Sequence, residues 1–397
     1  MIAIKTLVEL FDTCQIENVI AALRFKPEKI VFVGFKKIMT RKKTEDLQRF
    51  FEMKQLDIQL EYRIVPRYDY EEIVSGLNAI IDENEDAAFD LTGGKELVLV
   101  AMGEISAARS VPMFQFDVRS GEMVRVKNCE NVPETEKPVM SIEENIVLSG
   151  GVVVEEPEQP KWNLTEDFEK DTAIMWDICR KSCRAWNRNS GIIKMFEAAN
   201  ESGEGLFVKV SASKMRDLPD EKIMDELVKS GMIKNYAAGD VVTFEYKNDQ
   251  VRRVLNKAGN ILELSVYINA KKIQEQDSQY YDDIDTGVFV DWDGESGGQN
   301  DTRNEIDIFV MRDLVPVFVS CKNGEVHKEA LYELNTVAEK FGGEYAKKVL
   351  VCTYISYSKS SREYILQRAR DMKIEVVEDV DLLSGEEFLQ EIRKRIR

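Results

Sequence analysis

The regular alternation of strand-like and helix-like segments over the first 130 residues restricts the fold more than any other feature. The segments follow one another in this order: strand 6–11, helix 16–25, strand 29–35, helix 44–53, strand 57–65, helix 69–84, strand 87–92 and helix 94–109. Strands that alternate with helices predict a parallel sheet joined by crossover helices. With a closing hairpin around Gly121, we predict a Rossmann-like α/β domain over residues 1–135.

Length and composition are those of an ordinary globular protein of two or three domains. The chain has 397 residues, of which 44% are apolar and 32% charged. No apolar run approaches the roughly 20 residues that a membrane helix needs, and the six cysteines form no CxxC pair. We expect a cytoplasmic protein without membrane contact. The net charge of -18 argues against indiscriminate binding to polyanions, although it allows a local basic surface.

The rest of the chain divides into three further parts. Residues 136–165 hold three prolines and many glutamates, which indicates a linker. Helices followed by an extended strand predict a winged-helix-like or small helical domain over 166–255. The last part, 256–397, has the order helix, three strands, helix, strand, helix, strand, and we predict a second α/β domain there.

Charged side chains gather on two consecutive strands of this last domain. Glu305 and Asp307 lie two apart on one strand, and Ser320 and Lys322 lie two apart on the next. Residues two apart on a strand point to the same face, so one cluster is expected to hold all four side chains. Glu263, in the first turn of the preceding helix, is a candidate third acid.

These residue types suit the cleavage of phosphodiesters. Carboxylate oxygens bind Mg²⁺ or Mn²⁺, and we expect Glu263, Glu305 and Asp307 to be the metal ligands. A lysine beside such a metal can orient water and offset charge that develops on a phosphate. The alternative is that acids and a lysine meet on neighbouring strands by chance, since edge strands often carry lysine.

The pattern of Glu263, Asp307 and Lys322 resembles the PD-(D/E)XK nuclease superfamily, in which a helix glutamate precedes strands bearing D…(D/E)xK. The resemblance implies catalytic roles for these three residues and for position 320. Ser320 stands where the family motif has an acid, which puts metal binding in doubt unless Glu305 takes its place.

The loop between the fourth strand and helix of the first domain, Thr92–Gly93–Gly94–Lys95, has the composition of an anion site. Backbone N–H groups at a helix start attract phosphate, and glycines let it approach closely. An N-capped helix after a tight turn is the equally plausible alternative. Further polar groups follow the first strand, at the same predicted edge of the sheet: Asp12, Thr13, Gln15 and Asn18.

A strand followed by "TGGK" and a helix, together with a polar first loop, resembles the CARF domain of CRISPR-associated proteins. In the order CARF, middle domain and PD-(D/E)XK domain, the chain resembles the CRISPR ancillary nucleases of type III systems. The resemblance implies a homodimeric, Mn²⁺- or Mg²⁺-dependent endonuclease that cuts DNA or RNA in antiviral defence. It also implies activation by a cyclic oligoadenylate, most simply cyclic tetra-adenylate, bound by the polar residues of the two loops.

One alternative function remains open from the sequence. The N-terminal domain would sense a nucleotide, residues 166–255 would bind DNA, and a degenerate nuclease domain would serve assembly alone. Ser320, in place of the expected acid, is the feature that favours this DNA-binding regulator.

Overall fold

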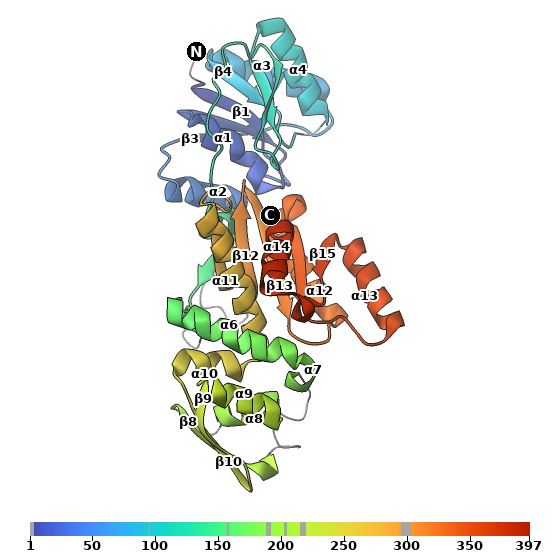
Figure 1. The fold of residues 1–397 in the computed structure, drawn as a ribbon. Helices are drawn as coiled ribbons and strands as arrows, with labels where there is room; N and C mark the ends of the chain where they lie inside the picture. The colour runs from blue at the N-terminus through green and yellow to red at the C-terminus, as the bar shows by residue number, and fades with distance from the viewer. Residues whose placement is uncertain are drawn as a thin grey trace.

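Three sheets follow one another along an elongated molecule (Figure 1). The computed structural model describes residues 4–94, 96–156, 159–187, 192–201, 205–214, 220–294 and 303–397. The C-terminal domain lies between the other two, so the order in space differs from the order in sequence. In the part of the chain that the structure describes, no helix combines the length and apolar character needed to cross a membrane.

The N-terminal domain has the predicted α/β alternation. Its six-stranded sheet has the order β3-β2-β1-β4-β5-β6, parallel except for the closing strand β6. Its elements are β1 (Thr6–Leu10), η1 (Gln15–Asn18), α1 (Ile20–Phe25), β2 (Lys29–Gly34), α2 (Arg41–Met53), β3 (Gln59–Ile64), α3 (Tyr70–Glu83), β4 (Ala87–Asp90), α4 (Glu96–Arg109), β5 (Met113–Phe116) and β6 (Met123–Lys127). The central strands β1 and β4 are buried throughout, as expected for a parallel sheet covered by helices on both faces.

The helix predicted over 16–25 is broken into η1 and α1 at Val19. Asn18 causes this difference, because its side chain bonds the backbone of Asp12 in both directions: its Oδ1 accepts from Asp12 N at 2.7 Å and its Nδ2 donates to Asp12 O at 3.1 Å. An asparagine whose side chain bonds a backbone outside the helix favours a turn at that point.

The segment 136–165, predicted as a linker, adds two elements to the C-terminal domain. Helix α5 (Ile142–Leu148) begins at a capping box formed by Ser141 and Glu144, and strand β7 (Val152–Val154) pairs antiparallel with β11. The Asn145 amide also donates to Phe341 O at 2.7 Å. The glutamates and prolines around a strand of three residues hide its pattern in the sequence.

The middle domain has the winged-helix arrangement. Its elements are α6 (Glu166–Lys181), α7 (Cys183–Trp186), α8 (Ile192–Glu201), β8 (Phe207–Ser211), η2 (Ala212–Lys214), α9 (Glu221–Lys229), β9 (Ile233–Ala237), β10 (Val241–Tyr246) and α10 (Asp249–Asn256). Its antiparallel sheet has the order β8-β10-β9, with β9 and β10 as the wing. The helix predicted over 220–233 ends at Lys229, because Gly231 has a φ of 77°, in the left-handed region.

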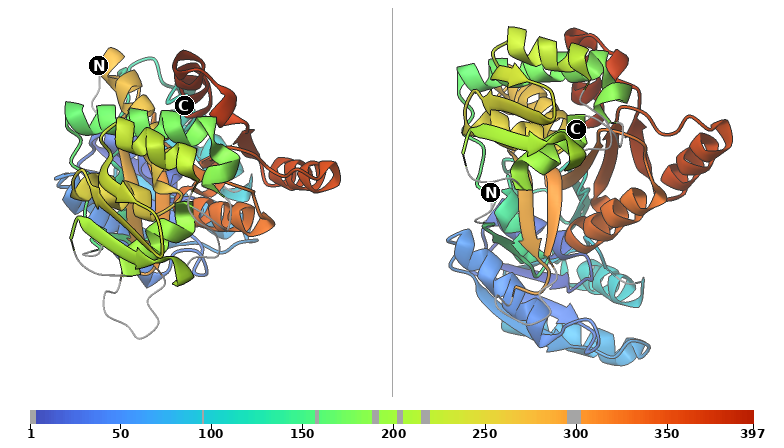
Figure 2. Two further views of the ribbon diagram at one scale, coloured as in Figure 1. Left: turned by 60° about the horizontal axis from the view of Figure 1, so that its bottom comes forward. Right: turned by 90° about the horizontal axis from the view of Figure 1, so that it is seen from below.

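The C-terminal domain has the predicted element order around a mixed sheet, β15-β14-β13-β12-β11-β7. Its elements are α11 (Asn260–Gln276), β11 (Asp283–Asp291), β12 (Arg303–Arg312), β13 (Val315–Lys322), α12 (Lys328–Gly342), η3 (Gly343–Tyr345), β14 (Lys347–Cys352), α13 (Lys359–Asp371), β15 (Ile374–Val377), η4 (Val380–Leu382) and α14 (Gly385–Arg395). Buried residues of α11 and α14 cover one face, and those of α12 and α13 cover the other. Helix α13 stands out from the molecule in both views of Figure 2.

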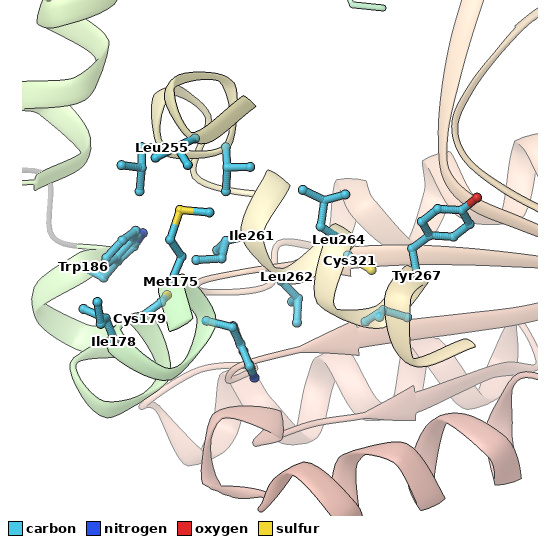
Figure 3. Close-up of a cluster of buried hydrophobic side chains, with 14 of the residues drawn as sticks. Met175, Ile178, Cys179, Trp186, Leu255, Ile261, Leu262, Leu264, Tyr267 and Cys321 are labelled. Carbon is cyan, nitrogen blue, oxygen red and sulfur yellow. The ribbon is translucent and has the colours of Figure 1, made fainter. Parts of the chain in front are cut away.

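The hydrophobic cores run across the domain boundaries. One core joins α6 of the middle domain to α11 of the C-terminal domain, where Met175 and Cys179 pack against Ile261 and Leu262 (Figure 3). A second core joins α1 and α2 to the opposite face of the C-terminal sheet. Because these surfaces are shared, the helix that carries Glu263 is buttressed by the middle domain.

Candidate active site

The candidate catalytic cluster forms where β12 and β13 stop pairing. Their ladder runs from Arg312 opposite Val315 to Ile308 opposite Val319, and Asp307 lies one residue beyond it. Beyond the ladder, the Asp307 carboxylate accepts hydrogen bonds from β13 in place of main-chain pairing. Its Oδ2 accepts from Cys321 N at 2.6 Å, Ser320 Oγ at 3.2 Å and Lys322 Nζ at 3.5 Å. The structure thus brings together three of the predicted residues, Asp307, Ser320 and Lys322.

Lys322 is the last residue of β13, and its ammonium group is held by attraction to nearby carboxylates. Burial lowers its pKa, but the facing carboxylates of Asp307 and Glu263 outweigh burial and leave the pKa raised. The ammonium group therefore stays protonated while half-buried beside Asp307. Such a group carries a fixed positive charge at neutral pH.

Glu263 approaches the same cluster from the first turn of α11. Burial, followed by repulsion from Asp307 and Glu305, raises its pKa to about 8, although Lys257 and Lys322 oppose the rise. Its Oε1 would lie 2.7 Å from a Cβ added at Gly259, so the glycine leaves room for the carboxyl to fold back over the helix start. The sequence prediction that this helix acid meets Asp307 and Lys322 agrees with this arrangement.

Glu305 faces a second lysine that the sequence analysis did not identify. Lys257 Nζ lies 3.2 and 3.3 Å from the two carboxylate oxygens of Glu305. The signal available in the sequence was its place six residues before Glu263, at the entrance to the same helix. Two acids and two lysines therefore pair at this end of the sheet.

The cluster is suited to a divalent cation by residue type, though not as a closed set of ligands. Among the described residues, no three His, Cys, Asp or Glu side chains come close enough together to hold a metal ion. Lys257 and Lys322 occupy the cation positions beside Glu305 and Asp307. A metal held by these carboxylates would have to displace Lys257 from Glu305, and it would relieve the repulsion that raises the pKa of Glu263.

A cleft of about 370 Å³ opens beside the cluster. Glu263 and Glu305 line it together with residues of α10 and of the segment 159–162. Its charged and aromatic lining includes Lys161, Trp162, Arg252, Arg253 and Lys257. The carboxylates of Glu263 and Glu305 thus share a cleft with basic and aromatic side chains.

The predicted effector residues of the first loop fall into two groups. Asp12 and Asn18 are buried, and they shape the loop. Asp12 Oδ1 accepts from Thr13 N at 2.5 Å and Cys14 N at 3.2 Å. Thr13 is exposed and Gln15 half-buried, and both line a cavity of about 370 Å³ between the N- and C-terminal domains. Lys42 and Lys43 of α2 line it as well, and the sequence analysis had not singled them out.

The second loop predicted to bind the effector is also held by internal hydrogen bonds. Thr92 is buried, donates from Oγ1 to Asp90 Oδ1 at 2.6 Å and accepts from Phe116 N at 2.8 Å. Gly93 has a φ of 76°, and a Cβ there would lie 2.5 Å from Glu17 Oε2. Gly94 has no room for a side chain beside Leu99. Lys95 lies outside the described residues, and its contact with phosphate stays a prediction.

Glu17 links this loop to the C-terminal domain. Its side chain packs under Gly93, and its Oε1 accepts from Tyr345 Oη at 2.6 Å. Burial and the facing carboxylate raise the pKa of Tyr345, which stays neutral. A direct contact therefore runs from the glycine loop through Glu17 to η3, which immediately precedes strand β14.

Comparisons with known proteins agree with this architecture. Residues 248–396 match the family of Card1-like endonuclease domains. Protein VC1899 from Vibrio cholerae shares 16% identity with a TM-score of 0.77, over 100% of this chain and 97% of its own. Can2 from Sulfobacillus thermosulfidooxidans, solved with cyclic tetra-adenylate, shares 15% identity with a TM-score of 0.72, over 98% of each chain. No curated protein matches the sequence. The likenesses to the two solved structures show a shared fold over the full length.

Proposed function

We propose, on the premise that residues 248–396 form a Card1-like endonuclease domain, that this chain is a cyclic-oligoadenylate-activated endonuclease of CRISPR antiviral defence. The N-terminal domain would be the sensor and the C-terminal domain the nuclease. An enzyme of this kind would act in the cytoplasm, where its nucleic-acid substrates are. The observation that carries the proposal is the meeting of Asp307, Lys322 and Glu263 where the strand ladder ends.

The side chains of the cluster have separate roles in this proposal. Glu263, Glu305 and Asp307 would hold Mn²⁺ or Mg²⁺, and a bound cation supplies Lewis-acid polarisation of the phosphate. Lys322 would offset the charge that develops on the phosphate oxygens, because its ammonium group is already fixed and protonated. Ser320 would orient Asp307 through its hydroxyl. Glu305, freed from Lys257, would supply the carboxylate that position 320 lacks.

The proposed activator is cyclic tetra-adenylate. Can2, whose fold this chain shares over its whole length, was solved with that molecule bound. We propose that a homodimer binds one ring, with Thr13, Gln15 and Lys95 of each subunit meeting half of it, since a two-fold ring matches a two-fold interface. Lys95→Ala should weaken ring affinity on the order of 100-fold if each copy loses a charge-assisted bond. Titration calorimetry checks both the stoichiometry and the affinity.

The alternative of a DNA-binding regulator gains no support from the middle domain. Its helix α9, in the position where winged-helix proteins present a recognition helix, exposes Glu221, Asp225 and Glu226 beside Lys222 and Lys229. Acidic side chains on that face repel phosphate. The acidic face of α9 therefore favours the nuclease over the regulator.

A direct assay separates the two functions. The full chain would be incubated with plasmid DNA, single-stranded DNA and RNA, with Mn²⁺, and with or without cyclic tetra-adenylate. We expect cutting that needs both metal and activator and that Asp307→Ala abolishes. Substrates that shift on a gel without being cut would instead support the regulator.

A further inference from the structure

Lys257 reaches the candidate metal ligands from outside the sheet that carries Glu305 and Asp307. It lies in the three-residue connection 257–259 between α10, the last helix of the middle domain, and α11. Its Nζ contacts both carboxylate oxygens of Glu305, at 3.2 and 3.3 Å. Among the described residues, Glu305 is the only carboxylate with which Lys257 forms an ion pair. One ammonium group therefore engages both oxygens that this acid would offer to a cation.

The connection that carries Lys257 is tied to both neighbouring domains by one side chain. Asn323, which directly follows Lys322, donates from Nδ2 to Ala258 O at 3.1 Å. The same Nδ2 contacts Cys179 Sγ of α6, in the middle domain, at 3.4 Å. The connection, the end of β13 and the middle domain therefore meet at Asn323. A shift of the middle domain against the C-terminal sheet would act on the segment that holds the ammonium group.

The two lysines of the cluster differ in how firmly they are placed. Lys322 belongs to β13, which pairs with β14 as far as Lys322 itself. Lys257 belongs to no helix or strand, and its side chain is 47% exposed, against 35% for Lys322. An ion pair at this exposure contributes little stability, so the pair of Lys257 with Glu305 opens at small cost. It has the properties of a reversible block on that acid.

We propose that Lys257 is an autoinhibitory residue, whose ammonium group takes the place of a cation at Glu305 until activation withdraws it. The proposal rests on the proposed nuclease function and names a point at which that function is regulated. Two cations at the same pair of oxygens would repel each other, so the ion pair and metal binding at Glu305 exclude one another. Lys322 stays beside Asp307 in both states, because β13 holds it.

Binding of Mn²⁺ in the absence of any substrate tests the block directly. Electron paramagnetic resonance would follow the loss of the free Mn²⁺ signal on addition of the full chain, with and without cyclic tetra-adenylate. Binding that Asp307→Ala removes defines the specific site, since a chain of net charge -18 also binds cations elsewhere. Lys257→Met removes the charge but keeps a stem of similar length, and without activator it should tighten this site about fivefold. With activator, the difference should fall below about twofold.

Three further variants separate the ion pair from charge alone. Lys161→Met removes another lysine of the same cleft, whose partner is Asp285, and it should change Mn²⁺ affinity less than about twofold. Lys257→Arg keeps the charge and suits both oxygens of Glu305, so it should bind Mn²⁺ no more tightly than wild type. In a Glu305→Gln background, Lys257→Met should give no gain, because the acid that it releases is absent. Circular dichroism would confirm that each variant is folded.

The outcomes separate failure of the block from failure of the nuclease. Equal Mn²⁺ binding by wild type and a folded Lys257→Met, including none in either, would overturn the block. An equal gain in Lys161→Met, a gain that persists in the Glu305→Gln background or a gain that the activator leaves unchanged would overturn it too. Slower cleavage by Lys257→Met with unchanged Mn²⁺ binding would assign the ammonium group to the substrate instead. A wild-type chain that cuts no nucleic acid under any condition would contradict the nuclease function, while the comparison of Mn²⁺ binding would still decide whether Lys257 excludes the metal.

Discussion

The strand ends of the N-terminal and C-terminal sheets use the same kinds of side chain in opposite ways. In the N-terminal domain, the side chains of Asp12, Asn18 and Thr92 form hydrogen bonds with the nearby backbone and with Asp90. In the C-terminal domain, Asp307 and Lys322 face each other beside an open cleft. Polar residues at the edge of the N-terminal sheet thus fix the conformation of their loops, whereas those at the edge of the C-terminal sheet pair opposite charges.

This comparison bears on how the two sites would work. The loops after β1 and β4 are held by their own hydrogen bonds, so a ligand there would meet a preformed surface. In the candidate catalytic cluster, Lys257 and Lys322 hold the acids, and a metal could displace Lys257 from Glu305. The contact from Gly93 through Glu17 to Tyr345 joins these loops to the C-terminal domain at the start of β14, the opposite end of that strand from the pairing of Lys322 with Cys352.

The largest expected effect comes from removing the fixed charge of the catalytic cluster. Lys322→Ala should lower the cleavage rate at least 100-fold, a barrier increase of about 3 kcal/mol or more, because no group then offsets the developing charge. Single-turnover cleavage with Mn²⁺ and activator measures the effect. Calorimetric affinity for cyclic tetra-adenylate should be unchanged. Cleavage at the wild-type rate would show that Lys322 has no catalytic role. The proposed contrast between the two sheet edges would then fail.

A buried acid pair under the N-terminal loops offers a second test. Glu9 and Asp90 are register partners on β1 and β4, with 1% and 0% of their surfaces exposed. Burial, then repulsion from Asp90, raises the pKa of Glu9 well above its usual range, and burial raises that of Asp90 to about 6. Since the folded state then holds protons that the unfolded state releases from about pH 4.5 upward, the stability of the chain should fall as pH rises from there.

Glu9→Leu should reduce that loss. The variant should be more stable than wild type at pH 8 by about 1–3 kcal/mol, the usual cost of a buried polar group without a partner. Below about pH 3, where both carboxyls are protonated in the folded and unfolded chains, the advantage should shrink. Urea denaturation across this pH range measures the difference. A variant that is less stable at pH 8 than wild type would show that the Glu9 carboxyl is satisfied within the sheet.

The smallest expected effect concerns the contact between the two regions. Tyr345→Phe removes one hydrogen bond to Glu17, worth about 1 kcal/mol. We expect the activator concentration for half-maximal cleavage to rise about fivefold, while the cleavage rate at saturation changes little. The matched control is Tyr364→Phe on α13, an exposed tyrosine of the same domain far from Glu17. Equal activation curves for Tyr345→Phe and wild type would show that the signal passes elsewhere.

Several features of the molecule follow from local sequence alone. The alternation of strands and helices specifies the parallel N-terminal sheet, because each period fits one kind of backbone. The spacing of two between Glu305 and Asp307 and between Ser320 and Lys322 places the acids and the lysine at one end of neighbouring strands. The first-turn position of Glu263 on α11 then completes the set that the sequence predicted.

Tertiary packing decided the remaining features. The pairing of β7 with β11, the approach of Lys257 to Glu305 and the bond between Glu17 and Tyr345 join segments that lie 48 to 328 residues apart along the chain. The Trp162–Arg253 stack likewise depends on α10 meeting the segment 159–162. No periodicity records such contacts, because they depend on how whole domains bury their shared apolar surfaces rather than on the conformation of any one segment.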